Sequence, residues 1–393
     1  MKVSVASRLG DVKEYYFSRK LREIREMNDR GMDILNLGIG SPDLPPHDDV
    51  ISELYHTAKE ESNHGYQSYK GLPELRTAMA KWYGDFYKVD LDYQSEVMPL
   101  IGSKEGIMHI SQTYLEKGDV VLVPNPGYPA YATAAGLAGA EVIYYDLNAK
   151  NNWEPDLSAI AKEDLSSVKI MWVNYPHMPT GKPATKALFQ RLIDFGRSHQ
   201  IMIINDNPYS FILNDEPLSI MQCDGAMEYA MELNSLSKAH NMAGWRVGML
   251  VGAQDRIDNV LRFKSNMDSG MFLGVQKAAI AALRLGSDWF EKLNTVYGSR
   301  KELAMQLLDI LGCTYDPNHQ GLFVWAKIPG EYKDGFELSD KFLYEAKVFI
   351  TPGGIFGSNG NGYVRISLCS KEAKFREAIQ RVEKVKTILK KAV

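Results

Sequence analysis

The sequence has little that would hold the chain in a membrane or on a nucleic acid. No apolar run in its 393 residues approaches the length of about 20 that a membrane-spanning helix needs. The formal net charge is −4, and Lys and Arg are spread along the chain, so the basic stripe of a nucleic-acid binder is missing. We therefore expect small-molecule substrates, no membrane and no nucleic-acid partner.

Cysteine is also scarce. Cys223, Cys313 and Cys369 are odd in number, widely spaced and without partners at metal-ligand spacing, so we expect reduced thiols, no disulfide framework and no metal site. The first residues, MKVSVASRLGDVKEYYF, lack the apolar segment and small-residue cleavage site of a secretory signal. These observations favour a cytoplasmic location.

From about residue 45 onward, short apolar runs alternate with stretches of helical periodicity. This alternation is typical of βαβ units, so it predicts an α/β fold in which helices flank a mainly parallel central sheet. The predicted strands are VVLVP, EVIYY, VKIMWV, IMIIN and VGMLVG, and the predicted helices lie at 73–87, 103–116 and 184–198.

The pattern changes after about residue 285. A long helical stretch leads to GLFVWAKI, KVFITPGG, YVRISLC and a Lys-rich terminal helix, which is a mixed α+β order. A helix is predicted over residues 11–29, in a segment too short to form a core of its own, so we expect that segment to dock on the C-terminal unit. The predicted domains are a large one at 45–285 and a smaller α+β domain made of 1–44 and 286–393.

The most specific motif is SLSKAHNMAGWRVG, which contains Ser235, Ser237, Lys238 and Arg246. Lys238 alone would be read as a solvated lysine in a turn. Two small hydroxyl side chains and an arginine at this spacing suit a bound phosphate beside a lysine that acts as a covalent amine. The motif therefore predicts that Lys238 carries a phosphorylated cofactor as a Schiff base.

A second signal follows the apolar run IMIIN. Asp206 ends that run and Tyr209 follows three residues later, and ligands of open α/β sheets bind at the carboxyl ends of strands. An isolated Asp before Pro208 would be read as the start of a turn. Combined with Lys238, Asp206 is predicted to keep a pyridine nitrogen protonated, and the Tyr209 phenol to bond the cofactor ring oxygen.

The third motif is GSKEG, in which Gly102, Ser103 and Lys104 follow the strand-like run VMPLI and open a helix. A glycine followed by a serine cap is by itself a common way to begin a helix. Backbone N–H groups at a helix N-terminus bind anions. Beside Arg246, this motif is predicted to form part of a phosphate site.

These motifs together resemble the class I/II aminotransferases, enzymes of pyridoxal 5'-phosphate (PLP) fold type I. The resemblance covers nearly the whole chain, since Lys238, Asp206, the GSKEG motif, PTG at 179–181 and Arg365 in YVRIS follow the family's order and approximate spacing. It implies that PLP is the cofactor and that the protein moves the amino group of an L-amino acid to a 2-oxo acid.

The resemblance also implies roles for four further residues. Tyr128 would stack on the pyridine ring, and Arg365 would fork onto the substrate α-carboxylate, a task for which Lys is a poor substitute. Gly40 would let the backbone approach the substrate. Tyr66 would reach the phosphate of the neighbouring subunit, which implies a homodimer with shared active sites.

One position departs from the family pattern. Met178 in NYPHMPTG stands where family members usually have an asparagine that contacts the ring oxygen, and a thioether cannot donate that bond. We hypothesise that Tyr209, helped by Asn174 or His177, carries that contact, and that the cofactor's imine with Lys238 titrates at higher pH than in the family.

Two other functions stay open on the sequence. A carbon–sulfur β-lyase of the same fold shares the carbanion chemistry, and a binding protein could keep the fold without turnover. The joint presence of Lys238, Asp206, Arg246 and Arg365 speaks against the latter. LGIGSPDLPPH and FKSNMDSGMFLGVQ resemble stretches of LL-diaminopimelate aminotransferases, yet no arginine at a matching position indicates a dicarboxylate substrate.

Overall fold

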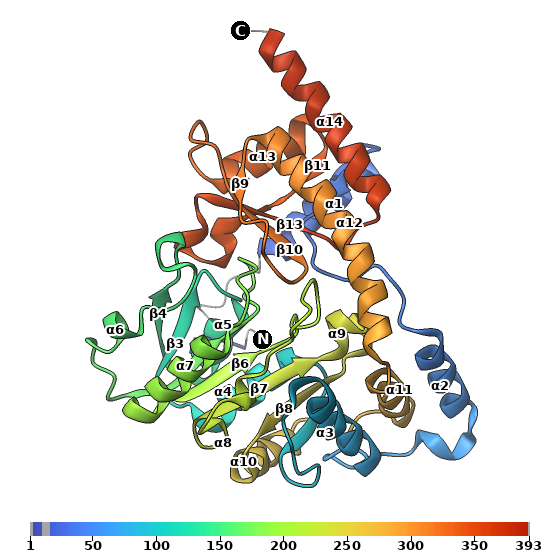
Figure 1. Ribbon diagram of the computed structural model, residues 1–393, viewed down its shortest axis with the longest axis vertical. Coiled ribbons are helices and arrows are strands. Elements are labelled where there is room, and N and C mark those ends of the chain that lie inside the picture. The colour runs from blue at the N-terminus through green and yellow to red at the C-terminus, as the bar shows by residue number, and fades with distance from the viewer. Residues whose placement is uncertain (1–2, 10–15, 392–393) are drawn as a thin grey trace.

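The structure is a computed structural model that describes residues 3–9 and 16–391, with side chains up to residue 387. Its two main sheets lie one above the other in Figure 1, the seven-stranded sheet in the lower part and the four-stranded sheet in the upper part. The long helix α12 (Ser287–Leu311) runs from the lower part to the upper part. None of the described helices has an apolar stretch that could cross a bilayer.

The lower sheet has the order β2-β8-β7-β6-β5-β3-β4. Neighbours from β7 to β4 are parallel, and β8 runs antiparallel to both β7 and β2. The strands are β2 (Val97–Leu100), β3 (Val120–Asn125), β4 (Glu141–Asp146), β5 (Val168–Val173), β6 (Met202–Asp206), β7 (Ala230–Ser235) and β8 (Gly248–Gly252). The predicted α/β fold with a mainly parallel central sheet is confirmed.

Helices cover both faces of this sheet, because successive side chains of a strand point to opposite faces. Val121 and Val123 of β3 pack in one apolar cluster with α4, α5 and α10, whereas Leu122 packs in the other with α3, α7 and α11. The helices are α2 (Asp48–Lys59), α3 (Pro73–Tyr87), α4 (Ser103–Tyr114), α5 (Ala130–Ala138), α6 (Leu157–Ile160), α7 (Lys186–His199), α8 (Ala226–Tyr229), α9 (Leu236–Ala239), α10 (Gln254–Lys264) and α11 (Leu273–Leu283).

Strand β7 lies inside the sheet, between β8 and β6, and it is not one of the strands predicted from apolar runs. Its sequence AMELNS contains Glu232 and Asn234, which would normally argue against a buried strand. The Glu232 carboxylate is fully buried and accepts hydrogen bonds from Tyr83 Oη at 2.8 Å and Ser219 Oγ at 2.7 Å. These tertiary partners, which are remote in sequence, make the buried charge tolerable.

The upper sheet is antiparallel in the order β12-β13-β10-β9. Strands β1 and β11 form a separate parallel pair, so the segment before residue 40 lies beside the C-terminal part of the chain. The strands are β1 (Leu35–Asn36), β9 (Thr314–Tyr315), β10 (Phe323–Lys327), β11 (Val348–Phe349), β12 (Thr351–Pro352) and β13 (Tyr363–Ser367), and the helices are α1 (Tyr16–Asp29), α12, α13 (Gly335–Glu345) and α14 (Glu372–Lys391).

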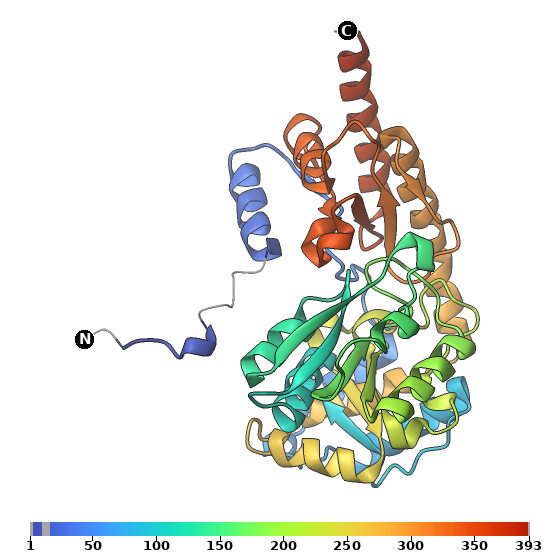
Figure 2. The ribbon, with the colours of Figure 1, turned by 90° about the vertical axis from the view of Figure 1, so that its left-hand side faces the viewer.

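Helix α1 is held against α13 by a buried cation. Lys20 Nζ lies 2.8 Å from a Glu23 oxygen and 3.1 Å from Asp340 Oδ1, and Figure 2 shows the two helices side by side. The described part of this helix begins at Tyr16, so residues 11–15 of the predicted helix fall outside the described residues. The division into domains at 45–285 and at 1–44 with 286–393 stays a proposal.

Candidate active site

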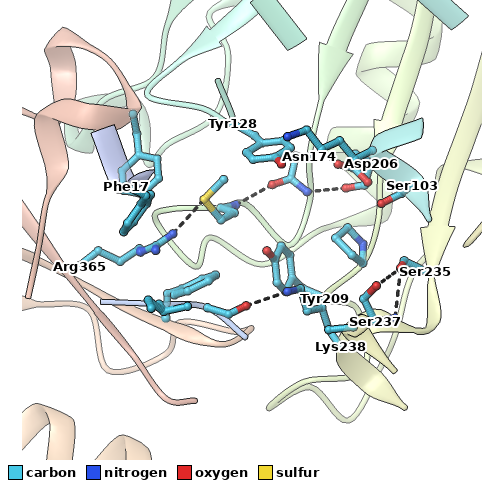
Figure 3. Close-up of a pocket in the computed structure, with 18 of the residues that line it drawn as sticks. Phe17, Ser103, Tyr128, Asn174, Asp206, Tyr209, Ser235, Ser237, Lys238 and Arg365 are labelled. Carbon is cyan, nitrogen blue, oxygen red and sulfur yellow. Dashed lines mark hydrogen bonds between the residues drawn. The ribbon is translucent and has the colours of Figure 1, made fainter. Parts of the chain in front are cut away.

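A cavity of about 530 Å³ lies where the carboxyl ends of the parallel strands face the upper sheet. Asn174 follows β5, Asp206 ends β6 and Lys238 follows β7, whereas Arg365 enters from β13 of the upper sheet. Figure 3 shows their side chains around this space. Such a crevice at carboxyl strand ends is where open α/β sheets bind their ligands.

Lys238 lies on the short helix α9, directly after β7. The Ser235 hydroxyl caps this helix by accepting from Ser237 N at 3.1 Å, which fixes the turn that directs Lys238 into the cavity. Lys238 Nζ donates to the Gly40 carbonyl at 2.7 Å. Burial lowers the pKa of the Lys238 amine, and the nearby Arg365 cation adds to this effect. A larger fraction of neutral amine favours both nucleophilic attack and proton abstraction.

The Asp206 carboxylate is buried and has one oxygen satisfied. Oδ2 accepts from Tyr131 Oη at 2.9 Å, and Oδ1 has no partner among the described residues. Burial raises the pKa of Asp206 to about 7, and the Tyr131 bond opposes that rise. A buried carboxylate oxygen without a partner implies a missing donor. A protonated pyridine nitrogen supplies one, so Asp206 fits the expected PLP ring.

The other end of the cavity fits a phosphate. Arg246 lies so close to Gly102 that a Cβ there would be 2.0 Å from Nη2, and Gly102 has a φ of +82° that favours glycine. Arg246 Nη1 is 3.5 Å from Ser237 Oγ, which in turn bonds Ser235 Oγ at 2.9 Å. Ser103 and Lys104 of the α4 N-terminus line the same end. Hydroxyls, a guanidinium and helix N–H groups together match a phosphate dianion.

Three further predicted residues also line the cavity. The Tyr128 ring meets Tyr131 edge to face at 5.6 Å, and the Tyr209 ring meets Phe323 edge to face at 5.8 Å. Burial raises the pKa of Tyr209, so its phenol stays protonated near neutral pH. Asn174 donates to the Asp206 carbonyl through Nδ2 and accepts from a backbone N–H through Oδ1 at 2.8 Å. The Asn174 amide therefore joins the ends of β5 and β6.

Arg365 lies at the end of the cavity that aromatic rings line. Its guanidinium lies 3.8 Å from the ring centre of Phe323 and 4.5 Å from that of Phe356, and Nη2 donates to the Gly38 carbonyl at 3.0 Å. Met178 Sδ contacts Nη1 at 3.3 Å. The planar group is thus held on both sides, an orientation suited to bidentate binding of a carboxylate.

Two predicted site residues, Gly102 and Tyr66, are absent from the cavity lining, and of these Gly102 lies beside Arg246, which does line it. Tyr66 lies elsewhere. It follows the short helix η2 (Glu61–His64) and is 93% exposed, away from the lining of this chain's cavity. Gly40, in contrast, lines the cavity, and a Cβ on it would meet Phe323 Cζ at 2.3 Å.

Tyr131, Phe17, Phe323 and Phe356 also line the cavity and were not predicted. Tyr131 had a usable signal, since it lies three residues after Tyr128 in NPGYPAY, which places both on one side of a helical turn. Its ring stacks on Trp172 at 4.9 Å. No local pattern connects Phe17, on a helix far away in sequence, with this site.

Comparison with known proteins agrees with this geometry. The family model described as aminotransferase class I and II matches residues 32–382. The chain is 39% identical to an LL-diaminopimelate aminotransferase of Dehalococcoides mccartyi, over 98% of this chain and 100% of that protein. It is 41% identical to one of Moorella thermoacetica, over 97% and 98%. The substrate-bound structure of BacF from Bacillus subtilis matches with a TM-score of 0.93 and 35% identity over 98% of each chain.

Proposed function

Because the chain belongs to the aminotransferase class I and II family, we propose that Lys238 is the residue that binds PLP covalently and moves the proton during amino-group transfer. The expected PLP fold type I is confirmed by these likenesses, and the protein is a PLP-dependent aminotransferase that moves an amino group from an amino acid to a 2-oxo acid. When bound, PLP supplies an electron sink for the substrate carbanion and a carbon that holds the amino group.

Lys238 acts as the base in this proposal. With PLP and an amino acid bound, its amine would lie beside the substrate Cα and would take up the proton there. Burial lowers the pKa of this amine, which keeps part of it neutral. The Gly40 carbonyl accepts a hydrogen bond from Nζ at 2.7 Å, which limits the positions that the Lys238 amine can take in the cavity.

Asp206 is proposed to hold the cofactor ring, and Arg365 the α-carboxylate of the substrate. Asp206 Oδ1 is the buried acceptor for the ring N–H, and this orphaned oxygen is the observation that carries the proposal. Arg365 binds the α-carboxylate and so fixes which substrate bond faces Lys238. The Tyr209 phenol, kept protonated by burial, bonds the ring oxygen.

We further propose that the active unit is a homodimer. Tyr66 exposes 93% of its surface and follows η2 on an exposed segment, so its phenol is open to contact with a partner chain. In the dimer, this phenol would bond the phosphate in the partner's cavity. A Tyr66→Phe variant should therefore weaken PLP binding while the protein still elutes as a dimer.

We also propose a cellular location for the protein and candidates for its amino donor. The three cysteines are buried and form no disulfide, which supports a reducing compartment, and we propose the cytoplasm. The names of the relatives make LL-diaminopimelate one candidate donor. The cavity lining favours a different class of donor.

The experiment that tests the proposal is a visible absorbance spectrum of the PLP-loaded protein before and after single amino acids are added without a 2-oxo acid. Bleaching of the yellow band with formation of the aminated cofactor is the expected result. Persistence of the band while ammonia and a 2-oxo acid accumulate from cysteine-type substrates would instead establish the β-lyase. Lys238→Ala should abolish turnover, and unchanged turnover in that variant would refute the central role of Lys238.

A further inference from the structure

The cavity has two chemically different ends. Hydroxyls and Arg246 form one end, beside Ser103 and Ser237, and the other surrounds Arg365 with aromatic rings. Figure 3 shows Phe17 next to Arg365 and far from Ser235 and Ser237. A substrate whose carboxylate binds Arg365 therefore has its side chain among the residues of the aromatic end.

Every charged side chain that lines the cavity in the described part of the chain already has a role in the proposed function. Arg246 and Lys104 suit the phosphate, Asp206 the ring nitrogen, Lys238 the amine chemistry and Arg365 the α-carboxylate. The described lining therefore offers no additional cation for a distal carboxylate and no additional carboxylate for a distal amine.

Helix α1 contributes an apolar wall instead. Phe17 and Leu21 are one helical turn apart, so they face the same side, and both line the cavity. Ile39 adds another apolar side chain, and it is 38% exposed, which leaves apolar surface open for a ligand to cover. Phe323 and Phe356 complete the wall, each only 5% exposed.

We propose that the preferred amino donor is an L-amino acid with a large uncharged side chain, aromatic or long aliphatic. This inference rests on the proposed aminotransferase function and names the substrate class of the same site. It differs from the substrate in the relatives' names, because LL-diaminopimelate carries a second amine and a second carboxylate. Within this chain's own lining, those charged groups would lose water against Phe17, Leu21 and Ile39 without gaining a described partner, which is unfavourable.

The size of the effect follows from the chemistry of apolar sites. Each methylene that a pocket buries changes selectivity by roughly 10-fold or more. A phenyl ring between Phe17 and Phe356 gains offset or edge-to-face contacts in addition to the area it buries. We therefore expect a preference of at least about 100-fold for L-phenylalanine over LL-diaminopimelate and over L-glutamate.

The first test measures single half-reactions of the PLP-loaded protein by stopped flow. L-Phenylalanine, L-leucine and L-methionine are each compared with LL-diaminopimelate, L-glutamate and L-aspartate, as the ratio of the bleaching rate constant to the apparent dissociation constant. Higher ratios for the three uncharged donors support the inference. If LL-diaminopimelate or a dicarboxylic acid reacts best, the inference is wrong and the aminotransferase proposal stands.

A second test does not depend on turnover and so separates the two failures. The binding of 3-phenylpropionate and of glutarate, which cannot react, is measured by calorimetry with the loaded protein. Tighter binding of 3-phenylpropionate by about 10-fold or more supports the apolar subsite even if no amino acid bleaches the cofactor. Equal binding, or tighter binding of glutarate, overturns it.

A matched pair of variants locates the subsite. Leu21→Arg places a cation in the apolar wall, whereas Ser18→Arg adds the same charge at an exposed position of α1 outside the lining. Leu21→Arg should shift the phenylalanine-to-glutamate ratio toward glutamate by at least about 10-fold, and Ser18→Arg should leave it unchanged. Equal ratios in the two variants, with both folded by circular dichroism, would remove Leu21 from the subsite.

Discussion

The Tyr131 hydroxyl donates a hydrogen bond to Asp206 Oδ2 at 2.9 Å, and the Tyr131 ring stacks on Trp172 at an angle of 6°. Burial and the Asp206 charge raise the pKa of Tyr131, so this phenol remains a donor throughout the physiological range. One carboxylate oxygen is thus fixed from within the protein and the other is left for the cofactor.

Tyr131→Phe removes this donor and leaves the ring stack in place. A hydrogen bond to a charged group contributes about 1.5–3 kcal/mol, so we expect PLP affinity to fall by roughly 10- to 100-fold. The pKa of Asp206, already about 7, should rise further, which moves the pH profile of activity toward higher pH. Titration of the apoprotein with PLP and the pH profile measure both effects. Tyr144→Phe, at a residue that is 57% exposed on β4, is the control.

Asp206 should destabilise the protein when PLP is removed. Its pKa of about 7 in the folded chain lies above the ordinary value of 3.8, so the folded state binds the extra proton between these pH values. The stability of the apoprotein therefore falls by about 1.4 kcal/mol for each pH unit as the pH rises through this window.

Asp206→Asn cannot ionise and escapes this loss. The PLP-free variant should melt at a higher temperature than the PLP-free parent at pH 8, and the difference should disappear near pH 4. Asp288→Asn, exposed on α12, controls for the lost charge. A constant difference across the pH range would contradict the assignment to Asp206.

Met178→Asn tests the position that departs from the family. Met178 Sδ lies 3.3 Å from Arg365 Nη1, and the asparagine would add a donor at the ring oxygen. This bond stabilises the deprotonated form, so the visible band of the bound cofactor should change at a pH lower by about one unit. Met178→Leu, which adds no donor, should titrate like the parent. An unchanged midpoint in Met178→Asn would mean that the residue does not contact the ring oxygen.

Gly102→Ala tests the phosphate end. The added Cβ would meet Arg246 Nη2 at 2.0 Å, so the guanidinium must leave its place, and the φ of +82° strains any residue other than glycine. PLP affinity should drop by at least about 10-fold. Gly298→Ala, on α12 with open space around it, should keep PLP affinity and gain about 0.5–1 kcal/mol of stability.

The sequence was sufficient where local chemistry decides the structure. The apolar runs at β3, β5 and β6 are buried on both faces, so they can be recognised as strands from the sequence without tertiary information. Strand β7 could not be recognised in this way, because the burial of Glu232 depends on hydrogen bonds from Tyr83 and Ser219, which lie elsewhere in the chain.

The same division holds at the site. Lys238, Asp206 and Arg246 belong to compact motifs, and the structure places them in one cavity with Arg365, while their catalytic roles remain proposals. The apolar wall forms only when α1 packs on α13, so no sequence pattern around Phe17 predicts that it lines the cavity. The exposed Tyr66 has its proposed contact on a second chain.

The segment between β1 and the cavity touches both reacting ends of the substrate site. The Gly38 carbonyl accepts from Arg365 and the Gly40 carbonyl accepts from Lys238. Two residues of backbone span at most about 7 Å, so this segment limits the distance between Arg365, which binds the carboxylate, and Lys238, which acts as the base. An amino acid with one more carbon between its amine and its carboxylate would present the wrong bond to Lys238. We therefore expect β-amino acids to be rejected by backbone length rather than by any side chain.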